Sequence, residues 1–486
     1  MRLAFALVVV VVIGFTMAAC SGLPGGGCLT NCSSGGSVSL VLTATPPPPT
    51  AGLSIQAFTA TITGITLSPA SGASPVAVDL NSTAYIAEFN RVTSDSTLLA
   101  SNVSVPAGSY NAVAVTFAAP KVAFCTQPDP GVAGCANSTL SAVSGTPGSV
   151  NFAANLTVAG NTLTGIVLNV NLGNALTQTG QTVTGVDLNL ANTFSATTLP
   201  PPASATDLPS TQLAHLDDVM GLVSKSTSSS VTIQTSTRGS VTANTNSSTV
   251  FACPAQDSSC VQINQVAVMD AVLNADGTIT TTFFQPIIDS GDLIEGMVAS
   301  VPDSVSNTFT LVATDSVFAP SNSVLNGELN IGDQVVVTLQ GTVQPFVIVG
   351  KGLGNPALPA NDFDGSTSVS ALHPGMTVLF PVKAYTAMSG TTPGATTTVS
   401  FALRFSRITT TMATPSSPDF SITGIGLPPF FGISSNQQAR TNPGRLSLDG
   451  AQTLTAIPAG HTISTSALYL GLPSSPLFVA QSVRTH

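Results

Sequence analysis

The sequence predicts an all-β protein in which an N-terminal antiparallel β-sandwich is followed by about three small β-barrel-like lobes. Three observations lead to this expectation: apolar and polar residues alternate along many short segments, one turn motif recurs in the second half, and only 7% of the 486 residues are charged. A period of two residues is typical of half-buried strands. Long helices and coiled coils need far more charged residues than this chain contains.

The alternation is clearest in the first half of the chain, in the segments 38–42, 58–62, 113–117, 166–172 and 186–190. Threonine is a frequent polar partner there, and it suits a pleated surface. The best candidate for a helix is the segment from Gln212 to Val219, where Leu213, Leu216 and Val219 would share one helical face. A proline-rich run from Leu199 to Ala203 interrupts the strand pattern and indicates a stiff linker.

The recurring turn has the form of an apolar residue, two residues, glycine, two residues and a second apolar residue. It occurs at 329–335, 372–378 and 457–463, and a degenerate copy at 261–267 has asparagine at the glycine position. We expect Gly332, Gly375, Gly460 and Asn264 to adopt a left-handed backbone that begins a strand. The segment from Asn274 to Thr278 is predicted to be a hairpin turn. The spacing of these units favours three OB-like lobes in series.

These patterns divide the chain into seven parts. We expect a signal peptide at 1–19, a Gly/Ser/Cys tether at 20–36, the β-sandwich at 37–198, a proline-rich linker at 199–214, a first lobe at 215–290, an enlarged second lobe at 291–402 and a third lobe at 403–486.

The N-terminus has the features of an export signal. Arg2 is followed by an apolar run from Leu3 to Phe15 and then by Met17-Ala18-Ala19-Cys20. A transmembrane anchor is the alternative, although the run falls slightly short of a bilayer span. The last four residues resemble the lipobox of bacterial lipoproteins. This resemblance implies cleavage before Cys20, diacylation of its sulfur (as with palmitate) and a lipid anchor in the cell envelope. Ser21 after the cysteine implies export to the outer membrane, facing the periplasm or the cell surface.

The six remaining cysteines form three close pairs, which are Cys28 with Cys32, Cys125 with Cys135, and Cys253 with Cys260. An even number of cysteines in an exported chain favours disulfides. Metal thiolates are the alternative, but a zinc site needs converging Cys/His pairs and no histidine lies near these cysteines in the sequence.

Two stretches resemble families of exported bacterial proteins that lack an assigned function. Val38 to Leu42, Phe58 to Leu67 and the turn from Val105 to Tyr110 resemble the family named domain of unknown function 4382, although Val105 stands where that family has leucine. The segments 219–223, 329–335 and 478–484 resemble the family named domain of unknown function 5666. The first resemblance implies a β-sandwich over 37 to about 195, and the second implies barrel repeats over 215–486. Neither implies a catalytic residue.

Motifs of catalysis are absent from the sequence: there is no G-x-S-x-G, no H-E-x-x-H and no P-loop. The four histidines are His215, His373, His461 and His486. His373 and His461 lie in the recurring turns, where we expect them to face solvent, and His486 is expected to be mobile. A Ser-His-Asp site assembled from distant residues stays an open alternative.

Two loops rich in acidic residues are weak calcium candidates: Asp362 and Asp364 in one, and Asp289 and Asp292 in the other. The spacing fails the EF-hand pattern, so solvated turns are the favoured interpretation and no metal or cofactor is expected.

The phenylalanines raise the question of sugar binding. Phe430 and Phe431 could form an exposed face on an open barrel, but the chain has no tryptophan and only four tyrosines, the residues that sugar platforms usually use. The alternative is that the phenylalanines fill the cores of the lobes.

The sequence therefore favours a non-catalytic, lipid-anchored envelope protein that acts as a binding, adhesion or structural module, with envelope proteins or glycans as partners. The alternatives are a glycan or small-ligand binding protein and, less favoured, a hydrolase with a site outside the known motifs. The formal net charge of −10 argues against nucleic acid as a partner.

Overall fold

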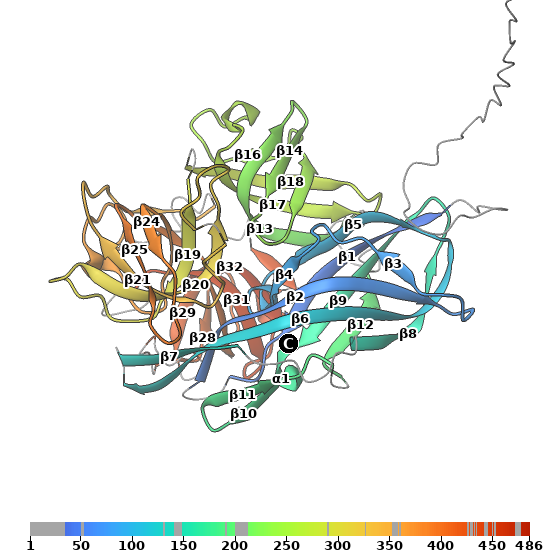
Figure 1. Cartoon of the computed structure of the whole chain (residues 1–486), viewed down its shortest axis with the longest axis horizontal. Helices are drawn as coiled ribbons and strands as arrows, with labels where there is room; N and C mark the ends of the chain where they lie inside the picture. The colour runs from blue at the N-terminus through green and yellow to red at the C-terminus, as the bar shows by residue number, and fades with distance from the viewer. Residues whose placement is uncertain are drawn as a thin grey trace, which may run out of the picture.

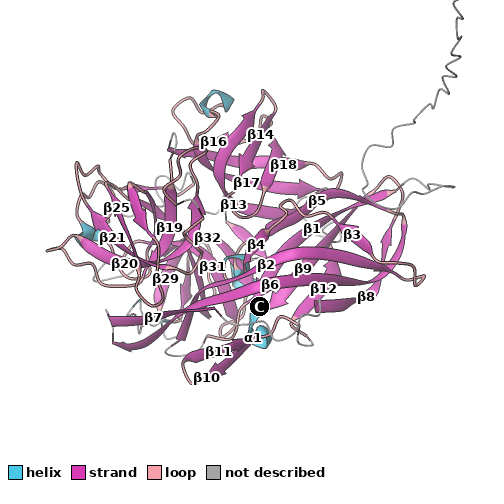
Figure 2. Ribbon diagram, viewed as in Figure 1, coloured by secondary structure: helices cyan, strands magenta, loops and turns pink. Residues whose placement is uncertain are grey.

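The structure is a computed structural model, and it confirms the all-β class (Figure 2). The residues that it describes are 35–49, 53–129, 132–139, 148–189, 192–199, 212–288, 291–325, 327–351, 358, 361–424, 427, 431, 433, 435–441, 446–449, 451, 453–471 and 478–486. The signal peptide, Cys20, most of the tether and most of the linker lie outside this part of the chain. Within it, no helix is both long enough and apolar enough to cross a membrane.

Two sheets of the N-terminal unit share one apolar core and form the β-sandwich. The first sheet has the order β12 (Phe194–Thr198), β9 (Leu163–Asn171), β1 (Gly36–Thr45) and β5 (Thr97–Val105). The second has the order β3 (Val76–Val78), β2 (Leu53–Pro69), β6 (Gly108–Asp129) and β7 (Val132–Thr139), with β4 (Tyr85–Glu88) on β2 and β8 (Gly148–Val158) on β6. Strands β1 and β9 run parallel, which departs from the expectation of a purely antiparallel sandwich.

Three short elements complete this unit. They are the 3-10 helix η1 (Arg91–Thr93), the helix α1 (Leu172–Ala175) and the hairpin of β10 (Leu176–Thr179) with β11 (Thr182–Val186).

The first lobe is a closed five-stranded barrel. Its strands are β13 (Gln212–Ser226), β14 (Ser230–Gln234), β15 (Ser240–Asn244), β17 (Val266–Asn274) and β18 (Ile279–Ile288), with the short β16 (Val250–Phe251) and the 3-10 helix η2 (Ser258–Cys260) between them. The order is β15-β14-β13-β17-β18, and a parallel contact between β15 and β18 closes the ring. Because β13 already begins at Gln212, the last residues of the expected linker belong to this barrel.

The third lobe repeats this order. Its strands are β27 (Ser406–Thr414), β28 (Phe420–Ile422), β29 (Gln437–Thr441), β31 (Thr462–Tyr469) and β32 (Phe478–Thr485), with β30 (Ser447–Asp449) beside β32 and the 3-10 helix η6 (Leu454–Ala456) before β31. Parallel pairing of β29 with β32 closes the barrel. A third strand that pairs in parallel with the fifth is the arrangement expected of OB-like barrels.

The second lobe follows the same order with a divided last strand. Its elements are β19 (Leu293–Val298), β20 (Thr308–Val317), β21 (Gln334–Leu339), β22 (Val347–Ile348), η3 (Val369–Ala371), β23 (Thr377–Pro381), β24 (Ala384–Thr386), β25 (Gly394–Thr398) and β26 (Ala402–Arg404). Strand β25 pairs in parallel with β21, and β26 pairs with β23. Strand β26 continues two residues past the expected boundary at 402.

The recurring turns behave as the sequence predicts. Gly332, Gly375 and Gly460 have φ angles of 93°, 98° and 89°, and Asn264 has a φ angle of 67°. In each barrel, the turn before the fourth strand donates its N–H to the first strand or its end: Asn264 to Val223, Gly375 to Val298 and Gly460 to Met412, each at 2.8 Å. This shared hydrogen bond explains three of the four copies of the motif. In the copy at 329–335, which precedes β21, Gly332 instead donates to Ala313 of β20 at 2.7 Å.

The expected helix from Gln212 to Val219 is wrong, because this segment is the beginning of β13. Leu216 pairs with Ala271, but Val219 pairs with Met269, so one extra residue bulges out of β13 at Asp217 and Asp218. The bulge shifts the apolar residues to a spacing of three, which imitates a helical face. Asp218 itself adopts a φ angle of 58°.

Apolar contacts join the four β units. Val41 and Leu98 of the sandwich belong to the core of the first lobe, and one apolar cluster extends through the second and third lobes. Another cluster connects the first lobe with the second, including Met220 and Leu293. Figure 1 shows the first lobe, in green, lying over the sandwich strands β1 and β5.

Candidate functional site

Ten charged side chains meet where the four β units converge, and we call them the interdomain ion network. None of these side chains is more than 13% exposed. The members are Arg91 and Asp95 from the sandwich, Asp218, Arg238 and Asp270 from the first lobe, Glu295, Asp315, Lys351 and Arg404 from the second, and Arg407 from the third. Five cations and five carboxylates therefore balance each other inside the protein.

Asp218 is the centre of this network. The β-bulge in β13 directs its carboxylate to Arg404 Nη2 at 2.6 Å, Lys351 Nζ at 3.2 Å and Arg91 Nη2 at 3.1 Å, and Arg407 contacts it as well. Burial alone would raise the pKa of Asp218, but the cations around it, led by Arg404, hold that pKa well below its ordinary value. Asp218 is therefore an anion that cations from three other β units neutralise.

Two further carboxylates extend the network. Arg404 Nε donates to Glu295 Oε2 at 3.0 Å, and Arg407 Nη1 donates to Glu295 Oε1 at 3.2 Å. On the other side, Asp315 Oδ2 lies 2.7 Å from Arg91 Nη1 and 2.9 Å from Arg238 Nη2. Each of these carboxylates receives cations from different units or elements, so the network connects all four β units.

A cavity of about 410 Å³ lies beside the network, between the sandwich, the first lobe and the third lobe. We call it the interdomain cavity. Among the residues that line it are Asn169 from β9, His215 and Asp217 from β13, Ser447 from β30, and Arg484 from β32. This volume lies within the range of small-molecule sites, which is about 300–1,000 Å³.

Arg484 is held rigidly in the cavity wall. Its Nη1 donates to the carbonyls of Val92, Thr93 and Asp95 at 2.9, 3.3 and 2.7 Å, and its Nη2 donates to Ser96 Oγ at 3.0 Å. Its Nε donates to Asp449, whose side chain is 59% exposed. This arginine therefore connects the third lobe to η1 and to the loop after it.

Asp217 faces the cavity and lacks such partners. Within the described residues, no group donates a hydrogen bond to its carboxylate, while the neighbouring Asp218 carries the ion pairs described above. Burial and the nearby Asp270 raise the pKa of Asp217 to about 6, although His215 and Lys351 partly offset the effect. The bulge thus separates two adjacent carboxylates into one that is neutralised and one that is not.

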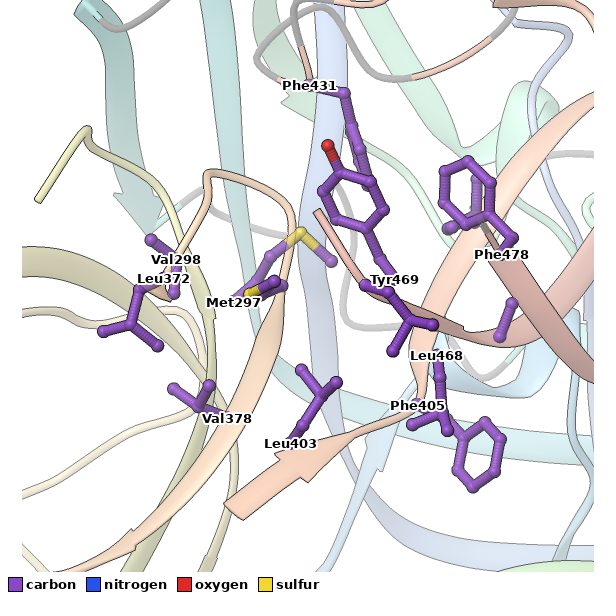
Figure 3. Packing of buried hydrophobic residues seen from close by; sticks show 14 of the residues in the cluster. Met297, Val298, Leu372, Val378, Leu403, Phe405, Phe431, Leu468, Tyr469 and Phe478 are labelled. Carbon is purple, nitrogen blue, oxygen red and sulfur yellow. The ribbon is translucent and has the colours of Figure 1, made fainter. Parts of the chain in front are cut away.

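The prediction of an exposed aromatic face is wrong for Phe431, the one of its two residues that the structure describes. Phe431 is only 7% exposed, and its ring lies 4.9 Å from that of Tyr469 and 6.0 Å from that of Phe478 (Figure 3). It fills the core of the third lobe, as the alternative interpretation held. Phe430 lies outside the described residues.

The acidic loops have simple structural roles. Asp292 is 5% exposed, and its carboxylate accepts hydrogen bonds from the backbone of Ala319, Val324 and Leu325, so it braces a loop and is not a solvated turn. Asp362 and Asp364 are exposed. Asp289 lies outside the described residues. Within the described part of the chain, no three His, Cys, Asp or Glu side chains come together in a way that could hold a metal ion.

The cysteines can be placed in part. Cys253 and Cys260 form a disulfide with Cα atoms 6.5 Å apart. Cys125 is also in a disulfide, and its backbone pairs directly with that of Cys135 between β6 and β7. Cys28 and Cys32 lie outside the described residues.

The histidines do not share a common role. His461 is exposed as expected, His373 is half-buried, and His215 lines the cavity. The expectation that His486 is mobile is wrong, because its Nε2 lies 2.9 Å from Ser464 Oγ and its N–H donates to Thr462. Burial lowers the pKa of His486 to about 4. Ser464 is fully buried at 0% exposure, so this serine–histidine contact offers no nucleophile to a substrate.

Sequence reasoning missed both the network and the cavity. The network joins residues as far apart as Arg91 and Asp315, which are 224 positions apart. A usable signal did exist, since Asp218, Glu295 and Arg404 interrupt apolar strand segments in a chain that is only 7% charged.

Comparisons with known proteins add little. No protein-family model matches the sequence, and no curated protein matches it. Among solved structures, one described as drosophila Unr CSD456 is 7% identical, with a TM-score of 0.13, covering 55% of this chain and 97% of that chain. A similarity at this TM-score carries no argument.

Proposed function

We propose that this chain is a lipid-anchored protein of the bacterial cell envelope that acts as a non-catalytic binding, adhesion or structural module. The observation that carries the proposal is the interdomain ion network, which joins all four β units through buried side chains. Buried ion pairs across every unit oppose their separation, so the units would present one fixed surface, which suits a binding or structural role.

The distribution of charge supports a role without nucleic acid. The chain has twelve Lys and Arg residues, and six of them are the network cations and Arg484. Because the network is balanced, the whole formal charge of −10 belongs to the rest of the protein. An acidic exterior repels phosphate backbones and attracts cationic groups.

The lipid anchor rests on Met17-Ala18-Ala19-Cys20. Two or three acyl chains on the mature N-terminus would hold the protein on a membrane durably. Ser21 favours the outer membrane over the inner membrane as its location.

The experiment that tests the anchor is mass spectrometry of the N-terminal peptide from protein isolated from its native membrane. We expect a peptide that begins at acylated Cys20, and we expect a Cys20→Ser variant to leave the membrane fraction or to accumulate uncleaved. An intact Met1 with a free Cys20 thiol would overturn the proposal.

Small-ligand binding is the second candidate, and the interdomain cavity favours it. The burial of Phe431 removes that ring as a sugar platform, so a ligand would have to enter the cavity between the β units instead.

A further inference from the structure

The walls of the interdomain cavity come from three units of the fold and are polar on several sides. On one wall, Asn169 Oδ1 accepts from Thr43 Oγ1 at 3.1 Å, and Asn169 Nδ2 donates to Thr45 Oγ1 at 3.0 Å. Asp217 belongs to the first lobe, and Ser447 to the third. The exposed side chain of Asp449 marks where the cavity meets solvent. A single buried water needs only about 10–15 Å³ of such space, so about 410 Å³ accommodates a small organic molecule.

The charge balance of these walls is negative. Arg484 donates to Asp449, to three carbonyls and to Ser96, so its N–H groups are engaged within the protein. Lys351, the ammonium that influences Asp217, lies 3.2 Å from Asp218 and 2.6 Å from Asp270 and is paired with both. In the part of the chain that the structure describes, Asp217 forms no ion pair, although His215 in the same cavity wall partly offsets its charge.

The Asp217 carboxylate is half-buried, and within the described residues no cation forms an ion pair with it, because His215 and Lys351 only partly offset its charge. An anionic ligand would add to the negative charge, and a neutral polyol would leave the carboxylate uncompensated. A cation placed against Asp217 gains an ion pair in a medium of low dielectric constant, where such a pair is stronger than in water.

We propose that the interdomain cavity binds a small organic cation, an ammonium or guanidinium compound, whose charged group pairs with Asp217. The hydroxyl and amide groups of Thr43, Asn169 and Ser447 would accept or donate hydrogen bonds to the rest of the ligand. This inference deepens the binding role proposed above, but its test is independent of the lipid anchor.

The test is isothermal titration calorimetry on the purified full-length protein at about pH 7.5, where Asp217 is ionised. The probes are ethanolamine, putrescine and agmatine, with glucose as a neutral compound and glutarate as an anion. We expect at least one amine to bind, and we expect Asp217→Asn to weaken that binding at least about tenfold. The matched control is Asp364→Asn, which makes the same charge change at an exposed turn and should leave the affinity within about twofold.

A second variant keeps the inference falsifiable if Asp217→Asn does not fold. Ser447 is half-buried on β30, and Ser447→Phe would place a ring in the cavity and abolish amine binding. The inference is overturned if no amine binds, if Asp217→Asn binds amines as well as the wild type does, or if glucose or glutarate binds in their place. A negative result in these titrations would not bear on the acylation of Cys20, so the ligand proposal and the lipid-anchor proposal can fail independently.

Discussion

Asp218→Asn is the substitution that tests the interdomain ion network most directly. Asparagine has nearly the same shape as aspartate and tolerates the left-handed backbone at this position, where φ is 58°. The change therefore removes one negative charge while it leaves the bulge of β13 intact. Four cations would lose a shared partner, namely Arg91, Lys351, Arg404 and Arg407.

The expected cost follows from burial. Removing one partner of a buried ion pair costs about 3–5 kcal/mol, because the remaining charge is left uncompensated. Arg404 would be destabilised most by the loss of its partner, because its side chain is 0% accessible to solvent and its Nη1 already has no hydrogen-bond partner among the described residues. An unfolding entropy of about 2.1 cal/mol/K per residue gives about 1 kcal/mol/K for 486 residues that unfold together. We therefore expect the melting temperature to fall by about 3–5 °C.

Differential scanning calorimetry is the assay, with Asp364→Asn as the control of equal charge. Because the network links four units, the single transition of the wild type should also broaden or divide in Asp218→Asn as the units unfold separately. If Asp218→Asn melted at the wild-type temperature with one transition, the network would not couple the units and the reasoning would be wrong.

Two further predictions concern the core and the dependence on pH. A Cβ at Gly375 would lie 2.5 Å from the ring of Phe431, whereas a Cβ at Gly390 would meet nothing within 4 Å, and both glycines have positive φ angles. In urea unfolding, we expect Gly375→Ala to lower the free energy of unfolding by about 3 kcal/mol and Gly390→Ala to lower it by about 1 kcal/mol. Equal losses would contradict the close packing of Gly375 against Phe431. Burial raises the pKa of Glu88 to about 7, so the stabilisation from its protonated form is complete below about pH 4.5 and is lost as the pH rises through 7. That loss is about 3 kcal/mol of the free energy of unfolding. Glu88→Gln should therefore make the free energy of unfolding less dependent on pH between about pH 5 and 8. An unchanged dependence on pH would refute the raised pKa of Glu88.

Local features of the fold could be predicted because they depend on neighbours in sequence. The left-handed turns at Gly332, Gly375, Gly460 and Asn264 follow from a motif of seven residues, and each has the expected backbone. The prediction of a helix from Gln212 to Val219 was wrong for an equally local reason, because a β-bulge changes the spacing of apolar residues from two to three. Sequence periodicity alone does not distinguish such a bulge from one turn of helix.

The site could not be predicted in the same way, because its residues meet only through the packing of whole units. Asp218 and Arg404 are 186 positions apart. Phe431 is the opposite case, because the sequence suggested a site that the structure does not have. A phenylalanine after two prolines and another phenylalanine gives no indication of whether its ring faces solvent or the core. In the structure that ring completes the core under Tyr469.

The presence of so many ions in the interior calls for an explanation other than stability. Apolar residues of similar volume often stabilise a protein as well as a buried ion pair does. Apolar surfaces, however, tolerate many relative orientations, whereas the four cations around Asp218 come from three other β units and must all reach one carboxylate. We infer that the network specifies the arrangement of the β units. The same arrangement creates the interdomain cavity and leaves Asp217 facing it, so the site for a cation is a consequence of how the units are joined.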